Sequence, residues 1–419
     1  MAILALIVYN YVMKIVHIIT RMILGGAQEN TLLTCIGQQK RGHEVILITG
    51  PTEGPEGELL SICKSKHLQV IEIKQMVRQI SPIKDLIAYQ KLKQILAELS
   101  PDIVHTHSAK AGILGRAAAW QLRVKSLGKT CCHKAAQVNI QRATCSGLPK
   151  IVHTIHGLSF HKYLPSWKNY IYITAEKYSA KQCDFILCVA QAMTDQAVAA
   201  GIGKPEQYIK VFSGMQVDHY LQAPSAQKID ETRNKLGIGP DHIVIAKVAR
   251  LFEFKGHDYV IEAAKEIVKI NKNVVWLFIG DGNLQEKLRQ QIDAEKLTAH
   301  FFFTGLVSPY EVAPLIHIVD ILIHCSLREG LARVLPQALL CKKPVISFDV
   351  DGAREVCINE QTGILIPPKD IKALIAAQLK LIQNPDLRAQ FGLTGQNMCK
   401  HTFCDNVMVD NIERVYQSL

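Results

Sequence analysis

The sequence contains no run of the roughly 20 consecutive apolar residues that a membrane-spanning helix requires. Its opening stretch, residues 1–9, is apolar but lacks the basic flank and small-residue cleavage site of a secretory leader, so no signal peptide is predicted. None of the 12 cysteines forms a Cys-x-x-Cys pair, and their irregular spacing is typical of reduced thiols in a cytoplasmic protein. A content of 48% hydrophobic residues excludes a disordered chain.

The second half of the chain has no net charge, so the whole excess of +11 lies in the first half. Residues 1–218 hold 25 Lys and Arg against 14 Asp and Glu, whereas the remaining residues hold 23 of each. A basic half favours an anionic partner, such as a phosphorylated substrate, an acidic lipid surface or a nucleic acid, although a merely solvated basic face is common. Nucleic acid is not predicted, because the basic segment 121–150 lacks interleaved aromatic residues.

Short apolar runs alternate with helical stretches along the whole chain. In the first half, strands are predicted at residues 15–19, 44–49, 70–73, 101–105, 151–154 and 185–189, with helices at 27–40 and 84–99. In the second half, strands are predicted at residues 243–248, 274–279, 300–303, 321–324, 344–347 and 363–366, with helices at 259–270, 284–293 and 336–340. Continuous apolar strands between helices predict parallel sheets that are covered on both faces.

The rhythm restarts near residues 214–230, so the 419 residues are predicted to form two doubly wound α/β domains, 13–218 and 219–399. Residues 121–150 break the rhythm with six basic residues and no acid, and they are predicted to be an inserted surface loop. A zinc site from Cys131, Cys132, His133 and Cys145 is a weaker interpretation, because adjacent cysteines are poor tetrahedral chelators.

Several loops that follow predicted strands carry residues suited to a phosphorylated ligand. Gly26 lies between the first strand and the first helix. Arg250 and Lys255 follow the first strand of the second domain, and Gly282 and Gly305 end turns after the next two strands. Ligands of parallel sheets bind outside the carboxyl ends of the strands, where helix N-termini favour anions. Each loop alone is weak evidence, because glycine also serves ordinary turns.

The stretch SLREGLARVLPQAL, residues 326–339, predicts a loop followed by a helix that begins near residues 334–336. Backbone N–H groups of residues 330–334 would then favour an anion, and Glu329 could accept hydrogen bonds from sugar hydroxyls. Gln337 is expected about two turns beyond Glu329, facing the same side. A helix with an ordinary surface Glu would explain one of these residues but not their combination.

Two short patterns suggest a metal site, and neither supports one strongly. Asp349-Val350-Asp351 has the Asp-x-Asp spacing of a metal-binding motif, but it lies late in the second domain. His105 and His107 are two apart on one strand and have no third ligand nearby in the sequence, so they fit better as polar groups at the mouth of a cleft. No metal is predicted.

With these residues in view, the chain from Met13 onward resembles the retaining glycosyltransferases of family 4, which have the GT-B fold. The resemblance excludes residues 121–150. It rests on Gly25-Gly26 and on several motifs in the same order: VHTHSAKAGILGR (104–116), VHTIHG (152–157), VARLFEFKGHD (248–258), IGDG (279–282) and REGLARVLPQALLCKKPVISFDVDGAREV (328–356). It implies two Rossmann-like domains facing across a cleft, with a C-terminal helix, about residues 400–419, packing back on the first.

The resemblance also implies roles for individual residues. It assigns the donor diphosphate to Gly26, Arg250, Lys255, Gly330 and Leu331; catalysis to Glu329 and His156; the nucleoside to Gly282, Gly305, Leu306 and Gln337; and the acceptor side to His107 and Lys110. Gln337 departs from the family's second glutamate, which holds ribose hydroxyls. Because an amide keeps a donor and an acceptor but loses the charge, we expect altered rather than abolished ribose binding.

The implied activity is transfer of a sugar, with retention, from a nucleotide diphosphate sugar, most simply a UDP-sugar, to a glycan or lipid-diphosphate acceptor in polysaccharide or cell-envelope synthesis. No cofactor is expected, since the nucleotide sugar is a substrate. A cytoplasmic protein with peripheral contact to the anionic inner membrane face is expected. A catalytically retired nucleotide-sugar-binding module and a UDP-sugar epimerase of the same fold remain alternatives, and product analysis would separate them.

Overall fold

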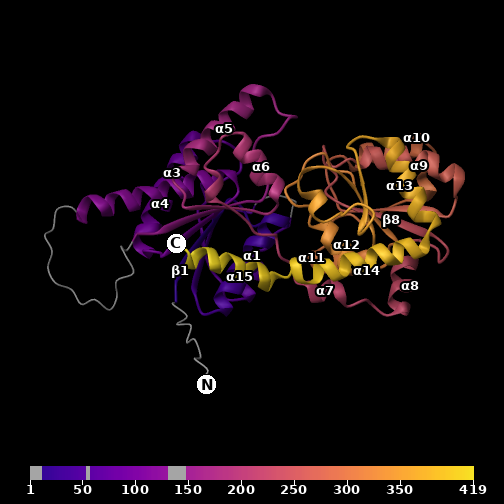
Figure 1. The fold of residues 1–419 in the computed structure, drawn as a ribbon, viewed down its shortest axis with the longest axis horizontal. Coiled ribbons are helices and arrows are strands. Elements are labelled where there is room, and N and C mark those ends of the chain that lie inside the picture. The colour runs from indigo at the N-terminus through magenta and orange to yellow at the C-terminus, as the bar shows by residue number, and fades with distance from the viewer. Residues whose placement is uncertain (1–11, 53–56, 131–147) are drawn as a thin grey trace, which may run out of the picture. The chain divides into compact units, whose positions relative to one another are not determined.

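The computed structural model describes residues 12–52, 57–130 and 148–419 (Figure 1). Contacts divide the chain into two compact units. The first comprises residues up to Leu187, Ala197–Ile209 and Asn411–Leu419, and the second comprises Cys188–Gln196 and Lys210–Asp410. The chain therefore passes into the second unit for most of its length near residue 210, and its last residues belong again to the first unit.

The first unit is built on a sheet with strand order β3-β2-β1-β4-β5-β6-β7 in the described residues. Its strands are β1 (Lys14–Ile19), β2 (Glu44–Thr49), β3 (Gln69–Glu72), β4 (Ile103–His107), β5 (Lys150–Ile155), β6 (Phe185–Cys188) and β7 (Tyr208–Lys210). Its helices are α1 (Gly26–Lys40), α2 (Leu60–Ser65), α3 (Pro82–Leu99), α4 (Ala109–Thr130) and α5 (Ser166–Ala180). From β3 to β5 the neighbouring strands run parallel.

The second unit has a parallel sheet with order β10-β9-β8-β11-β12-β13. Its strands are β8 (Ile243–Val248), β9 (Val274–Ile279), β10 (Phe301–Phe303), β11 (Ile321–His324), β12 (Val345–Phe348) and β13 (Gly363–Ile366). Its helices are α7 (Val217–Leu221), α8 (Ala226–Lys235), α9 (His257–Ile270), α10 (Gln285–Ala294), α11 (Pro309–His317), α12 (Val334–Leu340), α13 (Ile371–Gln383) and α14 (Pro385–Thr402). The chain changes units within β6, within α6 (Gln191–Ala199), within β7 and within α15 (Asp405–Gln417).

Both sheets owe their form to apolar strands that are buried on both faces. Central strands β1, β4, β8 and β9 have almost no exposed residue, and helices α9 and α13 pack on the second sheet over a core that includes Trp276 and Phe278. The Trp276 indole N–H donates to Gln378 Oε1 at 3.0 Å, so even this large side chain is satisfied inside the core. The predicted α/β class with two doubly wound sheets is confirmed.

The surface loop predicted for residues 121–150 is wrong at its beginning and its end. Helix α4 continues to Thr130, and β5 begins at Lys150. Arg123 holds this region to the sheet, because its guanidinium donates to the Pro149 carbonyl and to both carboxylate oxygens of Asp184. Cys131, Cys132, His133 and Cys145, the weaker zinc interpretation, lie outside the described residues.

None of the helices in the described part of the chain combines the length and the apolar content that a membrane crossing requires.

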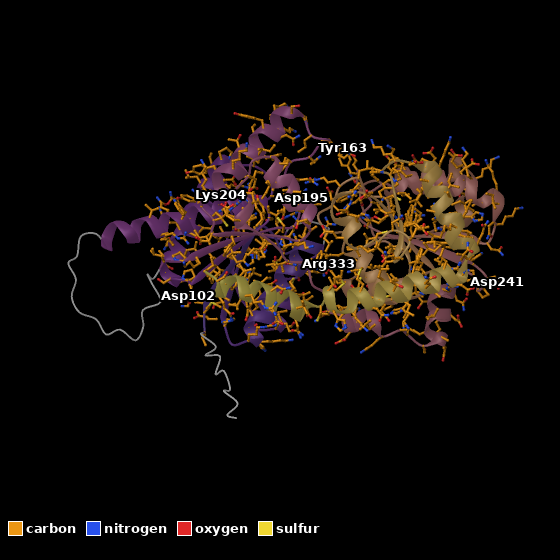
Figure 2. The ribbon with its side chains drawn as sticks, in the orientation of Figure 1. Asp102, Tyr163, Asp195, Lys204, Asp241 and Arg333 are labelled. Carbon is orange, nitrogen blue, oxygen red and sulfur yellow. The ribbon has the colours of Figure 1, made fainter. Side chains whose placement is uncertain are left out.

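Asp102, labelled in Figure 2, lies before β4 and accepts a hydrogen bond from the backbone N–H of Lys14 at 2.7 Å. This contact ties β1 and β4 together at their amino ends.

Candidate functional site

In the second unit, the loops that follow β8, β9, β10 and β11 are connected to one another at the carboxyl ends of these strands. Gly280 and Gly305 form a β-bridge, the Leu251 N–H donates to the Asp281 carbonyl at 2.9 Å, and the Leu327 N–H donates to the Phe254 carbonyl at 2.7 Å. The fold therefore brings Arg250, Lys255, Gly282, Gly305 and Glu329 to one edge of one sheet, as the sequence predicted for a ligand site.

Gly256 allows the Arg250–Lys255 loop to approach the loop after β11. Its φ is +72°, in the left-handed region, and a Cβ atom added there would lie 2.0 Å from the Cys325 carbonyl oxygen. No other residue type fits this position without moving the backbone. The glycine after Lys255 therefore serves to hold Lys255 against the loop that carries Glu329.

Lys255 and Glu329 form an ion pair in this position, and the pair is only partly exposed. His324 Nε2, at the end of β11, lies 3.7 Å from the same Glu329 oxygen. Burial raises the pKa of the Glu329 carboxyl, but the charge of Lys255 and the neighbouring His324 outweigh it, so the net pKa is well below its usual range. Glu329 is therefore ionised at neutral pH and available as a hydrogen-bond acceptor.

Lys247 lies on β8 beneath this pair, with a side chain that is 1% exposed. Its Nζ atom has no hydrogen-bond partner within the described residues, and the same holds for both ring nitrogens of the buried His257. Burial lowers the pKa of Lys247 to about 8 and that of His257 to about 2. A buried cation without a hydrogen-bond partner lowers the stability of the folded protein, and such residues are typical of functional sites.

The loop around Glu329 is held by the segment that contains Asp349 and Asp351, whose spacing only resembles a metal motif. The Glu329 backbone N–H donates to Asp351 Oδ2 at 2.7 Å, and the Gly352 N–H donates to the Gly330 carbonyl at 3.2 Å. Asp349 forms an ion pair with Arg354 at 2.5 Å. Both aspartates thus have roles in holding loops, and Asp351 orients the residue that carries the key carboxylate.

Helix α12 begins at Val334, within the range predicted from the sequence. Gln337 lies in its first full turn and is 8% exposed, whereas Glu329 lies in the preceding loop. The expectation that Gln337 lies on the helix after the Glu329 loop is therefore confirmed, and the expectation that both face the same side stays a prediction. Arg333, labelled in Figure 2, precedes α12 and donates to Ser213 Oγ at 2.7 Å and to the Gly214 carbonyl at 2.9 Å.

The other predicted nucleoside and phosphate residues differ in exposure. Gly330 and Leu331 are buried beside Asp351, while Leu306 is 50% exposed after the Gly305 turn. Arg250 is partly buried, with its guanidinium 5.8 Å from the centre of the Phe252 ring. Their roles toward a nucleotide stay predictions.

In the first unit, a cavity of about 260 Å³ opens at the carboxyl ends of β4 and β5. Ala27 at the start of α1, Ser108 at the end of β4 and His156 after β5 are among its lining residues. Its volume is below the several hundred Å³ that whole ligands occupy, so it suits one part of a ligand. His156 thus lines this cavity, and Gly26 directly precedes the lining residue Ala27.

The predicted acceptor-side residues behave differently from the prediction. His105 and His107 are fully buried, so their assignment to a cleft mouth is wrong: β4 is a central strand whose two faces are both covered. The Lys110 ammonium donates to the Gln79 carbonyl and pairs with Asp85 on α3.

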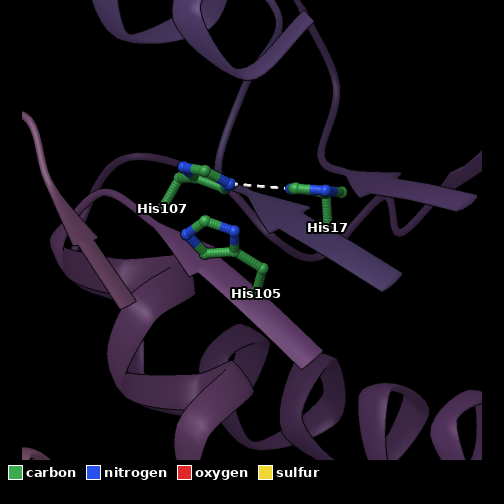
Figure 3. Close-up of side chains that lie close together, drawn as sticks. All are labelled: His17, His105 and His107. Carbon is green, nitrogen blue, oxygen red and sulfur yellow. Dashed lines mark hydrogen bonds between the residues drawn. The ribbon is translucent and has the colours of Figure 1, made fainter. Parts of the chain in front are cut away.

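Sequence reasoning also missed His17. This residue on β1 pairs in register with His105 on β4, and His17, His105 and His107 form a buried cluster (Figure 3). The alternation of side chains along paired strands could have identified it, but only once β1 and β4 were known to be neighbours.

The family description "Glycosyl transferases group 1" matches residues 228–398, and "Glycosyl transferase 4-like domain" matches residues 25–210. These two matches together span most of the chain and cover both units. The chain belongs to the family 4 glycosyltransferases.

This glycosyltransferase is 25% identical to the UDP-Gal:alpha-D-GlcNAc-diphosphoundecaprenol alpha-1,3-galactosyltransferase of Escherichia coli, over 88% of this chain and 87% of that one. It is 26% identical to the putative glycosyltransferase EpsD of Bacillus subtilis, over 80% and 81% of the two chains. Among solved structures, Anabaena Alr3699/HepE in complex with UDP-glucose matches with a TM-score of 0.78 at 19% identity, covering 97% of this chain and all of that one. That likeness shows the GT-B fold.

The buried cation of this glycosyltransferase gives a prediction about stability. Lys247→Met should raise the free energy of unfolding at pH 7 by about 3 kcal/mol, because each unit of depressed pKa costs about 1.4 kcal/mol when the folded protein keeps the proton. The wild type regains stability as the pH rises from about 8 toward 10.5, since folded Lys247 loses its proton before the unfolded chain does. The advantage of the variant should therefore be largest below pH 8 and shrink above it.

Denaturant unfolding at pH 7 and at pH 10 measures this difference. Lys269→Met, which removes an exposed cation from α9 of the same unit, is the control and should change stability little at either pH. A loss of stability in Lys247→Met at pH 7, or a gain that does not depend on pH, would contradict the assignment of an unpaired buried charge.

Proposed function

We propose that this glycosyltransferase moves a sugar from a UDP-sugar to a lipid-diphosphate-linked glycan, with retention of the anomeric configuration. The observation that carries the proposal is the Lys255–Glu329 ion pair at the carboxyl ends of β8 and β11, close to the buried Lys247. The loop after β8 that carries Lys255 also carries Arg250. One anion and several cations at a sheet edge match a ligand whose polar sugar hydroxyls adjoin a diphosphate.

The chemistry of the leaving group explains the cations. When the bond from sugar to diphosphate breaks, negative charge develops on the departing phosphate, and fixed positive charges stabilise that charge more than they stabilise the intact donor. Lys255 would contribute a point charge and Arg250 a planar fork of donors. Lys247, whose pKa of about 8 leaves it mostly protonated at pH 7, adds positive potential from below.

Glu329 would serve the sugar. Its carboxylate is ionised and is directed by the Lys255 ammonium and by the Asp351 contact to its own backbone N–H. In the absence of donor, Lys255 and Glu329 neutralise each other. In a complex with the donor, the diphosphate would contact Lys255 and the sugar hydroxyls would contact Glu329. The ion pair therefore holds these two side chains in place before the donor binds.

The relative from Escherichia coli supports the choice of donor and acceptor, because its name describes a UDP-sugar and a diphosphate-linked lipid. The basic first half of this chain suits the same class of acceptor. His156 beside the cavity of the first unit would contact the reacting sugar, and Gln337 would affect the grip on the nucleotide. Because side-chain cations supply the charge, we expect turnover to persist in a metal chelator.

The retaining route would use attack of the acceptor hydroxyl on the same face of the sugar that the diphosphate leaves. The departing phosphate would take the hydroxyl proton, so the balance needs no further base. This route requires no pair of carboxylates at glycosidase spacing. The presence of Gln337 in place of an acid is therefore compatible with activity.

Glu329→Gln and Lys255→Met should each lower kcat/KM for the donor by about 10²–10³-fold, because each removes one preorganised charged contact. The measurement is release of UDP from a panel of UDP-sugars, with a panel of GDP- and ADP-sugars for comparison. The matched controls are Glu360→Gln and Lys380→Met, which open an exposed ion pair of the same unit and should change the rate less than about twofold.

Full activity in Glu329→Gln would show that this carboxylate does not serve the sugar. Binding or turnover of none of the nucleotide sugars would overturn the proposed function as a whole. Activity with GDP-sugars alone would correct the nucleotide but keep the site.

We also propose that the first unit docks on the anionic inner face of the membrane. Large apolar side chains are exposed near the start of α3, where Ile83 is 76% exposed, and on α5, where Trp167 and Tyr170 are 63% and 74% exposed. Lys84 and Lys168 lie next to them in the sequence, and α3 and α5 both pack against α4 (Figure 1). Aromatic residues interleaved with lysines suit the boundary of lipid headgroups and acyl chains.

Sedimentation with vesicles tests this docking. The protein should bind vesicles that contain phosphatidylglycerol about tenfold more tightly than neutral vesicles at low salt, and a combined Ile83→Glu, Trp167→Glu, Tyr170→Glu variant should lose most of this binding. Leu393→Glu, an exposed apolar residue of α14 in the second unit, is the control and should bind like the wild type. Equal binding by the triple variant would contradict the proposed surface.

A further inference from the structure

A line of hydrogen-bonded side chains runs from Gln38 on α1 through the interior of the first unit to His156. Gln38 Oε1 lies 2.7 Å from His17 Nε2, and His17 Nδ1 lies 2.9 Å from His107 Nε2 (Figure 3). His107 Nδ1 lies 3.1 Å from His156 Nε2. Gln38, His17 and His107 are fully buried, whereas His156 lines the cavity. The line therefore connects an amide deep in the protein with the wall of the candidate site.

The two buried imidazoles of this line are neutral at physiological pH. Burial lowers the pKa of His17 to about 4, and the hydrogen bond with Gln38 opposes this only in part. Burial, and then the neighbouring histidines, lower the pKa of His107 well below its usual range. A neutral imidazole has one N–H donor and one lone-pair acceptor, so the role of one nitrogen determines the role of the other.

This rule gives the line a direction. The Gln38 carbonyl oxygen can only accept, so His17 must donate from Nε2 and accept at Nδ1. His107 then donates from Nε2 and accepts at Nδ1, and His156 must donate from Nε2. A neutral His156 ring therefore carries its proton on Nε2 and its lone pair on Nδ1. Turning the Gln38 amide by half a turn would reverse every link and move the His156 proton to Nδ1.

We propose that Gln38 is a positioning residue that, through His17 and His107, fixes His156 as the tautomer with its lone pair on Nδ1. This proposal rests on the proposed function. In it, the lone pair on His156 Nδ1 accepts a hydrogen bond from a hydroxyl of the sugar or of the acceptor, which a protonated Nδ1 could not do. Gln38 does not contact the cavity in this account. It acts only by deciding which nitrogen of His156 can accept.

A metal ion is the competing explanation of the same cluster. One ligand atom from each of His17, His105 and His107 lies within 4.8 Å of the others, and neutral imidazoles are good ligands. All six ring nitrogens already have partners, however. His105 contacts the Tyr416 hydroxyl at 2.5 Å and the Thr154 hydroxyl at 2.7 Å, in addition to the links of His17 and His107 described above. A metal would have to break this set of contacts, so the hydrogen-bonded line is favoured.

Nitrogen NMR of the full-length protein labelled with ¹⁵N-histidine tests the proposal. The His156 signals, assigned by their loss in His156→Asn, should show an unprotonated Nδ1 and a protonated Nε2. Gln38→Glu keeps an acceptor at the same place and should keep this tautomer. Gln38→Met removes the acceptor and should give a mixture of both tautomers. Gln378→Met, which removes an equally buried amide from the second unit, should leave the His156 signals unchanged.

Turnover should follow the tautomer. Gln38→Met should lower kcat about tenfold, the value of one hydrogen bond, with the donor KM unchanged, and Gln38→Glu should restore most of it. A merely structural role for Gln38 would lower stability without moving the nitrogen signals. The wild-type spectrum alone decides the tautomer if Gln38→Met does not fold.

Three results would overturn the proposal. They are a proton on Nδ1 of His156 in the wild type, a tautomer that stays single in Gln38→Met, and stoichiometric Zn²⁺ binding that is lost in His17→Asn. If no nucleotide sugar is turned over, the proposed function fails, yet the spectra still establish or reject the line from Gln38 to His156.

Discussion

Both sheets of this glycosyltransferase are parallel and covered on both faces, and this burial constrains every polar group that a central strand carries. Such a group must find partners inside the sheet, lose its charge, or lie where the strand ends. The histidines of β1 and β4 follow the first two routes, since they are neutral and bonded to one another. Lys247 on β8 takes none of these three routes in full. Its side chain is buried, has no hydrogen-bond partner in the described residues, and is still mostly protonated at pH 7.

The second unit shows how the same constraint concentrates chemistry at the carboxyl ends of strands. Gly256 allows two loops to touch, and this contact holds Lys255 against Glu329. Asp351 fixes the backbone of Glu329 from the other side. In the account proposed here, the charges are arranged before any donor arrives, so little reorganisation is needed when the sugar–phosphate bond breaks.

Much of the fold could be predicted from the sequence. Strands such as Ile243–Val248 and Val274–Ile279 were predicted to the residue, because buried parallel strands are continuous apolar runs between turn signals. The gathering of Arg250, Lys255 and Glu329 followed from the rule that ligands bind at the carboxyl ends of such strands. The extension of α4 to Thr130 was missed, because a basic segment that is rich in polar residues resembles a solvated loop.

The contacts that depend on tertiary neighbours could not be predicted. His17 and His107 are 90 residues apart in the chain, and their bond requires β1 to lie beside β4. The burial of His107 follows from the same strand order, which the apolar pattern alone does not reveal. Gln38 belongs to a helix whose inward face is set by its packing on β1 and β2.

The central claim is that the charges around Glu329 and Lys255 catalyse transfer with retention. The most direct measurement is the anomeric configuration of the sugar after transfer from an α-linked UDP-sugar to a GlcNAc-diphospholipid, read from the proton coupling of the anomeric centre by NMR. The account predicts an α-linked product. A β-linked product would contradict it, because inversion requires attack from the opposite face and a base that accepts the proton in place of the departing phosphate.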